Sequence, residues 1–275
     1  SEGDVYFRVA KSNNYAKLAN KTLEDLEIGA SGRTDAETER KENPLDFALW
    51  KAAKEGEVSW DSPWGPGRPG WHIECSVMAT EILGDTIDIH GGGADLEFPH
   101  HTNEIAQSEA KTGKTFANYW MHNGFVNVDN EKMSKSLGNF VTVHDMLQTV
   151  DGQVLRFFLA TQQYRKPINF TEKAIHDAEV NLKYLKNTHS LPLTEQVNQA
   201  ELQTYLDAFQ EAMDDDFNTA NGVTVLFDMA KWINSGNYDQ TVKDAFEKML
   251  QVFGIVFEEE VLDEDIEKLI EERQA

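Results

Sequence analysis

The chain has 275 residues, of which 40% are hydrophobic and 27% charged, and this balance predicts one large or two modest globular domains. Its formal net charge of −23 argues against a protein that coats nucleic acid, because phosphate binding needs basic surface, but it does not exclude a local basic groove. No apolar run is long enough to span a bilayer, and the single cysteine, Cys75, excludes an internal disulfide framework, so a reducing cytoplasm is the expected compartment.

The first 60 residues are predicted to form a connective region with short strands and helices. Residues 4–9 alternate in the manner of a strand. Residues 13–43 are polar and poor in large apolar groups, which is typical of a surface connection carrying short helices. Residues 45–53 are predicted to form a helix, because a broad apolar face is offered by Leu45, Phe47, Ala48, Leu49 and Trp50.

A tryptophan- and glycine-rich segment, residues 60–71, is predicted to be a loop. Its three tryptophans need something to pack on, so it is either a rigid structural loop or the wall of a substrate pocket. Downstream, helices are expected at 76–83 and 98–111, and short strands at 86–90 and 118–122. The strand–helix–strand order predicts a parallel sheet, and the glycines at 91–93 suit a crevice at the end of its first strand.

The pattern changes from Gly124 onward. Phe125, Val126 and Val128 are expected to form a brief strand, and Thr142 has the features of a helix N-cap. Everything after about Val154 is predicted to be helical. Three apolar stripes predict the core seams of an antiparallel bundle: Ala174, Ile175, Ala178, Leu182 and Leu185; Ala220, Val223, Leu226, Phe227, Ala230 and Ile233; and Ala245, Phe246, Met249, Leu250 and Phe253. The fold class expected for the whole chain is therefore α/β followed by all-α.

Two lysines, Lys132 and Lys135, flank a methionine and a serine on a short glycine-closed turn. A lysine ammonium is a mobile point charge suited to phosphate oxygens, so the pair could follow a phosphate group into a transition state. An arbitrary Lys-x-Ser-Lys is usually only a solvated basic turn.

The sharpest chemical cluster lies upstream of this turn. His100 and Glu104 are four residues apart and share one helical face, and Cys75 is expected just before a helix. Thiolate, imidazole and carboxylate are all zinc ligands, but a tetrahedral site needs four. Local chemistry alone leaves two alternatives open, a metal site or residues that are simply packed.

Several blocks in order resemble the cysteinyl-tRNA synthetases, which are class I aminoacyl-tRNA synthetases. The resemblance covers roughly residues 5–169 and rests on residues 67–76 (Gly-Arg-Pro-Gly-Trp-His-Ile-Glu-Cys-Ser), 88–96, 98–101, 103–108, 118–122 and the lysine turn Lys132-Met133-Ser134-Lys135-Ser136. It implies that residues 61–123 are the second half of a Rossmann-type catalytic domain. It further implies a lysine-loop and stem-contact region at 124–165 and a tRNA-contacting helical bundle at 166–275.

The same resemblance implies roles for individual residues. Cys75, His100 and Glu104 match three of the family's four zinc ligands, and the zinc takes the substrate thiolate. Trp71, His90 and Asp95 match substrate-binding positions. Lys132 and Lys135 match the catalytic loop, and the residues implied in ATP binding are Lys135, Ser134, Ser136, Gly124, Phe125 and Val126. The implied partners are ATP with Mg²⁺, L-cysteine and the cysteine tRNA, and the full-length enzyme is expected to be a cytoplasmic monomer.

The chain departs from the family pattern in two places. It has no His-x-Gly-His element, and Cys75 is its only cysteine, so the fourth zinc ligand is absent from these residues. We therefore expect an internal fragment that lacks the N-terminal part of a synthetase, does not adenylate cysteine by itself and holds zinc weakly. Two alternatives stay open: the related cysteine ligase of mycothiol synthesis, and a non-catalytic module that binds tRNA or metal.

Overall fold

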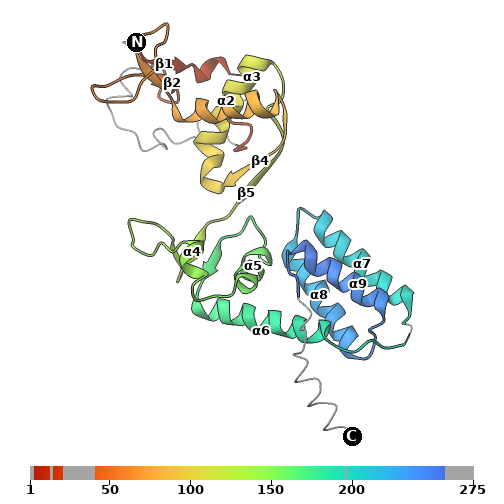
Figure 1. The fold of residues 1–275 in the computed structure, drawn as a ribbon. Coiled ribbons are helices and arrows are strands. Elements are labelled where there is room, and N and C mark those ends of the chain that lie inside the picture. Colours follow the sequence, from red (N-terminus) through yellow and green to blue (C-terminus); the bar gives the residue numbers. More distant parts are fainter. Residues whose placement is uncertain (1–2, 13–14, 21–40, 196, 258–275) are drawn as a thin grey trace. The chain divides into compact units, whose positions relative to one another are not determined.

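The computed structural model describes residues 3–12, 15–20, 41–195 and 197–257 (Figure 1). The chain divides into two compact units, Ser1–Phe125 and Val126–Ala275. Most of the polar connection expected at 13–43 lies outside the described residues. Within the described residues, no helix is both long and apolar enough to cross a membrane.

The first unit opens with an antiparallel sheet in the order β1 (Val5–Phe7), β2 (Phe47–Ala52) and β3 (Gly67–Pro69). A 3₁₀ turn, Val9–Lys11, follows β1. The strand predicted near residues 4–9 is confirmed, whereas the helix predicted at 45–53 is wrong, because β2 occupies that segment. Strand β2 hydrogen-bonds to β1 on one side and to β3 on the other. The residue after β3, Gly70, also lies against β2, because a Cβ added to it would lie 2.1 Å from the Ala48 carbonyl oxygen. These long-range pairings override the apolar face that resembled a helix.

A β–α–β unit follows and confirms the predicted parallel sheet. Helix α2 (Trp71–Leu83) leads to β4 (Ile87–Gly93), and α3 (Thr102–Thr112) connects β4 to its parallel partner β5 (Ala117–Asn123). Helix α2 begins five residues before the predicted start, so Cys75 lies inside it rather than ahead of it. Strand β4 runs on through the three glycines, which pair with Met121, His122 and Asn123.

The approach to α3 is irregular. The Phe98–Pro99 peptide bond is cis. A 3₁₀ turn, Ala94–Leu96, and a π-helical turn, Glu97–His101, which is interrupted by the extended backbone of Phe98 (φ −139°, ψ 131°), precede the helix. Helix α3 therefore starts four residues later than the predicted 98. A Cβ on Gly92 would lie 2.9 Å from the His101 ring, so only glycine lets that imidazole lie against β4.

The second unit begins with a small mixed sheet in the order β7 (Glu131–Lys132), β6 (Val126–Val128) and β8 (Ile168–Phe170). The predicted strand near residue 126 is confirmed. Strand β8 contradicts the prediction that everything after Val154 is helical. It pairs in parallel with β6, a contact 42 residues distant in sequence at Val126↔Ile168, which no local pattern reveals.

The described residues of this unit also form six helices: α4 (Val143–Met146), α5 (Gly152–Ala160), α6 (Glu172–His189), α7 (Gln199–Asp214), α8 (Thr219–Asn234) and α9 (Gln240–Val252). Each begins at a side chain that accepts a backbone N–H, which satisfies a donor the helix leaves unpaired; the caps are Thr142, Asp151, Thr171, Asn198, Asn218 and Asp239. The predicted cap at Thr142 is therefore confirmed.

One apolar core is shared by the five helices α5, α6, α7, α8 and α9. The three predicted stripes supply much of it: their buried members are Ala178, Leu182, Leu185, Leu226, Ala230, Ile233, Ala245, Phe246, Met249, Leu250 and Phe253. Ala220 is exposed and does not belong to it. Tyr238 is almost fully buried, and its hydroxyl donates to the His189 carbonyl oxygen at 2.8 Å, so this core includes a satisfied polar group.

Candidate functional site

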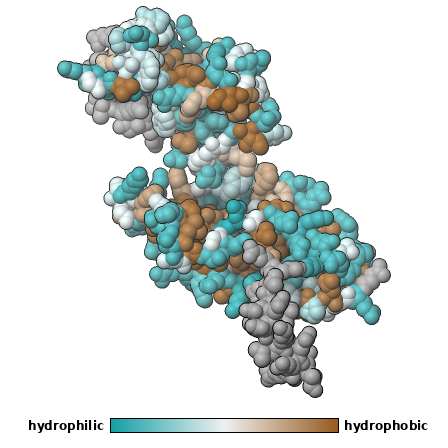
Figure 2. Space-filling model, in the orientation of Figure 1, coloured by the Kyte–Doolittle hydropathy of each residue, from teal (hydrophilic) through white to brown (hydrophobic). Residues whose placement is uncertain are grey.

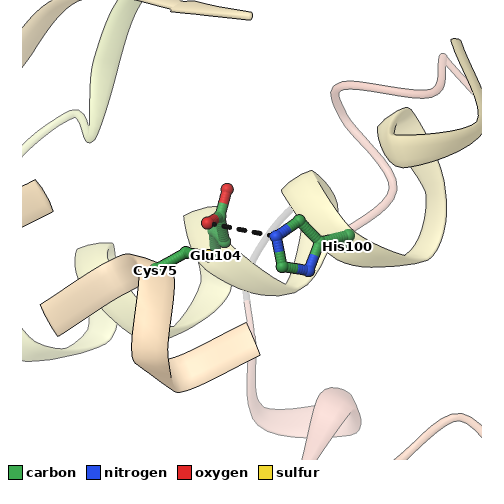
Figure 3. Close-up of side chains that lie close together, drawn as sticks. All are labelled: Cys75, His100 and Glu104. Atoms are coloured by element: carbon green, nitrogen blue, oxygen red, sulfur yellow. Dashed lines mark ion pairs between the residues drawn. The ribbon is translucent and has the colours of Figure 1, made fainter. Parts of the chain in front are cut away.

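The predicted thiol, imidazole and carboxylate come together in the first unit (Figure 3). Cys75 lies in α2, His100 in the π-helical turn and Glu104 in the first turn of α3. One ligand atom from each lies within 4.8 Å of the others. His100 and Glu104 are buried, and Cys75 is half-buried. The two helices that carry them are held together by Gln107, whose amide donates to the Ser76 hydroxyl at 2.8 Å.

One oxygen of the Glu104 carboxylate is suited to bind a metal ion. Its Oε1 is buried and accepts no hydrogen bond from the described residues, although His100 Nε2 lies 3.4 Å away. An unsatisfied carboxylate oxygen in a protein interior costs free energy, so it calls for a partner. The neighbouring thiol and imidazole are both zinc ligands, so a divalent transition metal fits this set of donors.

Ionisation at the cluster is governed by burial and by the histidines. Burial opposes the charge of Glu104, but contacts with His100 and His90 outweigh it and lower its pKa to about 2, so the group is a carboxylate at neutral pH. Burial and the charge of Glu104 raise the pKa of the Cys75 thiol. Burial lowers the pKa of His101 to about 4, which keeps that imidazole neutral.

Alkylation of Cys75 is expected to be slow in the metal-free chain. Because the pKa of the thiol is raised, the reactive thiolate is scarcer at neutral pH than on an exposed cysteine, and the rate should reach half of its maximum at a higher pH than the value of about 8.5 at which a free thiol is half ionised. Mass spectrometry with iodoacetamide measures the rate on one site, since the chain has one cysteine. The urea-unfolded chain is the reference, and equal rates in the folded and unfolded chain at pH 7 would contradict the assignment.

Further histidines surround the cluster, and three of them were missed as site residues. The Nδ1 atoms of His72 and His100 lie 2.8 Å apart, and His101 Nδ1 lies 2.8 Å from His122 Nε2. His90, His101 and Glu104 form a second group able to hold a metal ion. His72 precedes Cys75 by one helical turn, a spacing that could have revealed it once α2 was placed correctly.

Two of the three predicted substrate-binding residues, Trp71 and His90, contact the predicted metal ligands, and the third, Asp95, does not. The Trp71 ring stacks on His100 with centroids 4.4 Å apart, and His90 Nε2 lies 2.7 Å from Glu104 Oε2. Asp95 lies in the exposed turn after β4, and no described contact joins it to the three predicted ligands. Trp71 thus belongs to the cluster's surroundings.

The segment 60–71 is only partly the predicted loop, because it includes β3 and ends at Trp71, the first residue of α2. Trp64, from the part between β2 and β3, lines an apolar groove of about 710 Å³ with Trp50 and Met78. Figure 2 shows apolar patches among hydrophilic side chains on the surface of this unit.

The lysine loop lies in the second unit, directly after β7. Strands β6 and β7 meet at a tight turn in which Asp129 and Asn130 have φ of 49° and 68°, the left-handed values that a two-residue hairpin requires. The exposed Lys135 Nζ lies 5.5 Å from the centre of the Phe140 ring. Lys132 is also exposed, at the end of β7.

The other predicted ATP-binding residues lie in the lysine loop and in the segment 124–126. Ser134 and Ser136 lie in the lysine loop with hydroxyl oxygens 3.2 Å apart. Gly124 is buried and Phe125 half-buried at the end of the first unit. Val126 begins β6, and its carbonyl oxygen accepts from the Met133 N–H at 3.1 Å, which ties that strand to the start of the loop.

Residues 1–180 match the family model of the tRNA synthetases class I (C) catalytic domain, and residues 208–258 match the DALR domain. The chain belongs to the class I tRNA synthetases. Its fold class, a class I catalytic domain followed by a helical domain, is the predicted α/β followed by all-α. The missing His-x-Gly-His element does not prevent the catalytic-domain model from matching most of the chain.

Similar proteins give the same family. The chain is 95% identical over all 275 residues to a cysteine–tRNA ligase of Streptococcus thermophilus and 85% identical over 274 residues to one of Streptococcus pyogenes serotype M6. It spans 62% and 61% of the length of these curated relatives. Among solved structures, a methionyl-tRNA synthetase of Mycobacterium tuberculosis in complex with methionyl-adenylate aligns with a TM-score of 0.55 at 15% identity, covering 90% of this chain and 57% of that one, which shows a shared fold.

Proposed function

We propose that this synthetase chain is part of a cysteine–tRNA ligase, which activates L-cysteine with ATP and transfers it to the cysteine tRNA. The observation that carries the proposal is the cluster of half-buried Cys75 with buried His100 and Glu104 on a class I catalytic domain, in which one carboxylate oxygen accepts no hydrogen bond from the described residues. The relative that is 95% identical is named a cysteine–tRNA ligase, and this supports cysteine as the amino acid.

In this proposal Cys75, His100 and Glu104 hold a zinc ion, with a fourth ligand outside these residues. Bound zinc supplies a soft Lewis acid that prefers a thiolate to a hydroxyl, which gives discrimination that an apolar pocket lacks against a serine of similar size. Trp71 stacks on the imidazole of His100 and so helps to hold that ring in place. His90 and Asp95 are assigned to the amino-acid pocket, Asp95 through its charge.

The lysine loop is assigned to ATP. Lys132 and Lys135 present two ammonium groups on one exposed loop, which suits the negative charge that develops on a departing pyrophosphate. Ser134 and Ser136 add hydroxyl donors, and Gly124, Phe125 and Val126 are assigned to the adenine. Mg²⁺ is expected to accompany ATP. We assign the stem-contact role to residues 124–165 and tRNA contact to the helices of 166–275, and we expect a cytoplasmic, monomeric full-length enzyme.

Two alternatives are weaker. A cysteine ligase of mycothiol synthesis would share the activation chemistry, but the curated relatives named above are tRNA ligases. A non-catalytic tRNA- or metal-binding module would not explain the lysine loop. The net charge of −23 also opposes strong tRNA binding outside a local basic site. Which acceptor the full-length protein charges, tRNA or a glucosamine-inositol, separates the first alternative from the proposal.

Cysteine-dependent ATP–pyrophosphate exchange tests the proposal. The full-length protein should exchange with cysteine and not with serine, and Lys135→Ala should lower the rate by about 10²- to 10³-fold, the usual loss for one group that stabilises transition-state charge. Lys248→Ala, an exposed lysine on α9, is the matched control and should retain the rate.

The 275-residue chain by itself should show no exchange, because it has no His-x-Gly-His element. Exchange by the full-length protein that does not depend on cysteine would refute the proposed function, and robust exchange by the 275-residue chain would refute the prediction for the chain alone.

A further inference from the structure

Two histidines outside the predicted ligand set each contact one of the predicted ligands. His72 lies in the first turn of α2 and contacts His100, and His90 lies in β4 and contacts Glu104. His72 is buried, and its ring packs edge-on against Phe47 with centroids 5.6 Å apart, so it is held firmly. These contacts could simply be hydrogen bonds that satisfy polar atoms in the interior. The particular ring nitrogens and carboxylate oxygen that take part, however, indicate a role in orienting the metal ligands.

The contact between His72 and His100 joins two Nδ1 atoms at 2.8 Å, so one of them donates a proton and the other accepts it. The other ring nitrogen of His100, Nε2, is the atom that lies 3.4 Å from Glu104 Oε1. If His100 binds a metal ion through Nε2, that nitrogen must present a lone pair, so the proton of the neutral ring is on Nδ1. His100 must then donate to His72, and His72 must be the tautomer with its proton on Nε2.

The contact between His90 and Glu104 selects an oxygen. His90 Nε2 lies 2.7 Å from Oε2, and a carboxylate can only accept, so His90 donates. Oε2 is thereby occupied, and Oε1 is left as the buried oxygen without a hydrogen bond, the atom nearest His100. Although His90 also belongs to a second group of possible metal ligands, a direct hydrogen bond at 2.7 Å leaves no space for an ion between these two atoms.

We propose that His72 and His90 are positioning residues for the metal centre: His72 accepts the Nδ1 proton of His100 and so keeps its Nε2 free to bind the ion, and His90 holds Glu104 so that Oε1 faces the ion. This inference rests on the metal site of the proposed function and deepens it. It assigns His90 to the carboxylate of Glu104, in addition to the amino-acid pocket.

Zinc affinity of the full-length protein, measured by competition with a chromophoric chelator, tests the inference with matched variants. His72→Asn places an amide oxygen near the Nδ1 position and should keep the affinity within a few-fold, whereas His72→Leu removes the acceptor and should weaken it about 10- to 100-fold. His90→Gln keeps a donor near the Nε2 position and should behave as wild type, whereas His90→Leu should weaken binding by a similar factor. His122→Gln, in the same histidine cluster but in contact with His101, is the control and should not change the affinity.

The outcomes separate this inference from the proposed function. Stoichiometric zinc in the wild type that is lost in Cys75→Ala supports the metal site, and unchanged affinity in both leucine variants would then overturn the positioning roles alone. If the wild type binds no zinc, the metal site and the positioning roles both fail.

Nitrogen-15 spectra of the imidazoles in the zinc-loaded wild type give a test that does not depend on any variant folding. His100 should carry its proton on Nδ1 and His72 on Nε2. The reverse tautomers would refute the role of His72, whatever the leucine variants do.

Discussion

Glu104→Gln is expected to reduce the zinc affinity of the full-length protein by about 100-fold or more. Zinc sites with four ligands contribute about 10–16 kcal/mol in total, so each ligand accounts for about 3 kcal/mol, which is roughly a hundredfold. Glutamine has the shape of Glu104 but no charge, and the pKa of Glu104, about 2, shows that the native group is a carboxylate at neutral pH. Chelator competition measures the affinity, and cobalt substitution followed by its absorption spectrum gives an independent readout of the Cys75 thiolate.

Glu74→Gln is the matched control. It removes the same charge one residue from Cys75, but its side chain is exposed and it belongs to neither group of metal-binding residues. Zinc affinity should stay within a few-fold of wild type, because exposed charges are screened by solvent. Equal losses in both variants would mean that net charge, rather than coordination by Glu104, determines the affinity.

Phe246→Ala is expected to destabilise the helical core of the second unit by about 3–5 kcal/mol, the usual cost of deleting a buried phenylalanine side chain. Phe246 is fully buried on α9, and the core it belongs to joins residues from five helices, so the backbone cannot collapse easily into the space. Hydrogen exchange of the amides in α8 and α9 reports the opening of this unit separately from the first unit. Faster exchange there should accompany unchanged exchange in α2 and α3.

Phe217→Ala tests whether the effect comes from burial. Phe217 is 54% exposed, and the substitution deletes the same atoms. It should change the free energy of unfolding by less than about 0.5 kcal/mol, as is usual for surface positions. A comparable loss in both variants would contradict the assignment of Phe246 to the core.

Sequence reasoning succeeded where local pattern and tertiary structure agree. The apolar stripes of α6, α8 and α9 and the cap at Thr142 are local features, and the structure contains them. It failed at β2 and β8, whose hydrogen bonds go to strands distant in sequence. Segment 45–53 shows the difficulty: its apolar face suits a helix, and only the pairing with β1 and β3 makes it a strand.

The candidate site was predictable in part for the same reason. The four-residue spacing of His100 and Glu104 placed them on one face, and the chemistry of a thiol as a metal ligand grouped Cys75 with them. The resemblance then matched all three to zinc ligands, and the structure brings all three together. His101 and His122 were not predicted as site residues, because the contact between them depends on the register of β4 with β5. That register sets Gly92 opposite His122. That register leaves room at Gly92 for the His101 ring, a steric requirement that cannot be read without the paired strands.

The lysine loop closes on itself through one side chain. Asn139 Oδ1 accepts from the Ser134 N–H at 2.9 Å, and its Nδ2 donates to the Lys132 carbonyl oxygen at 3.3 Å, so the amide clasps the start and the end of the loop together. Lys132 and Lys135 are therefore mounted on a single ring, anchored to the sheet at β7. A displacement of this loop backbone would therefore move the attachment points of both lysine side chains together, while each flexible stem still lets its ammonium group adjust by itself.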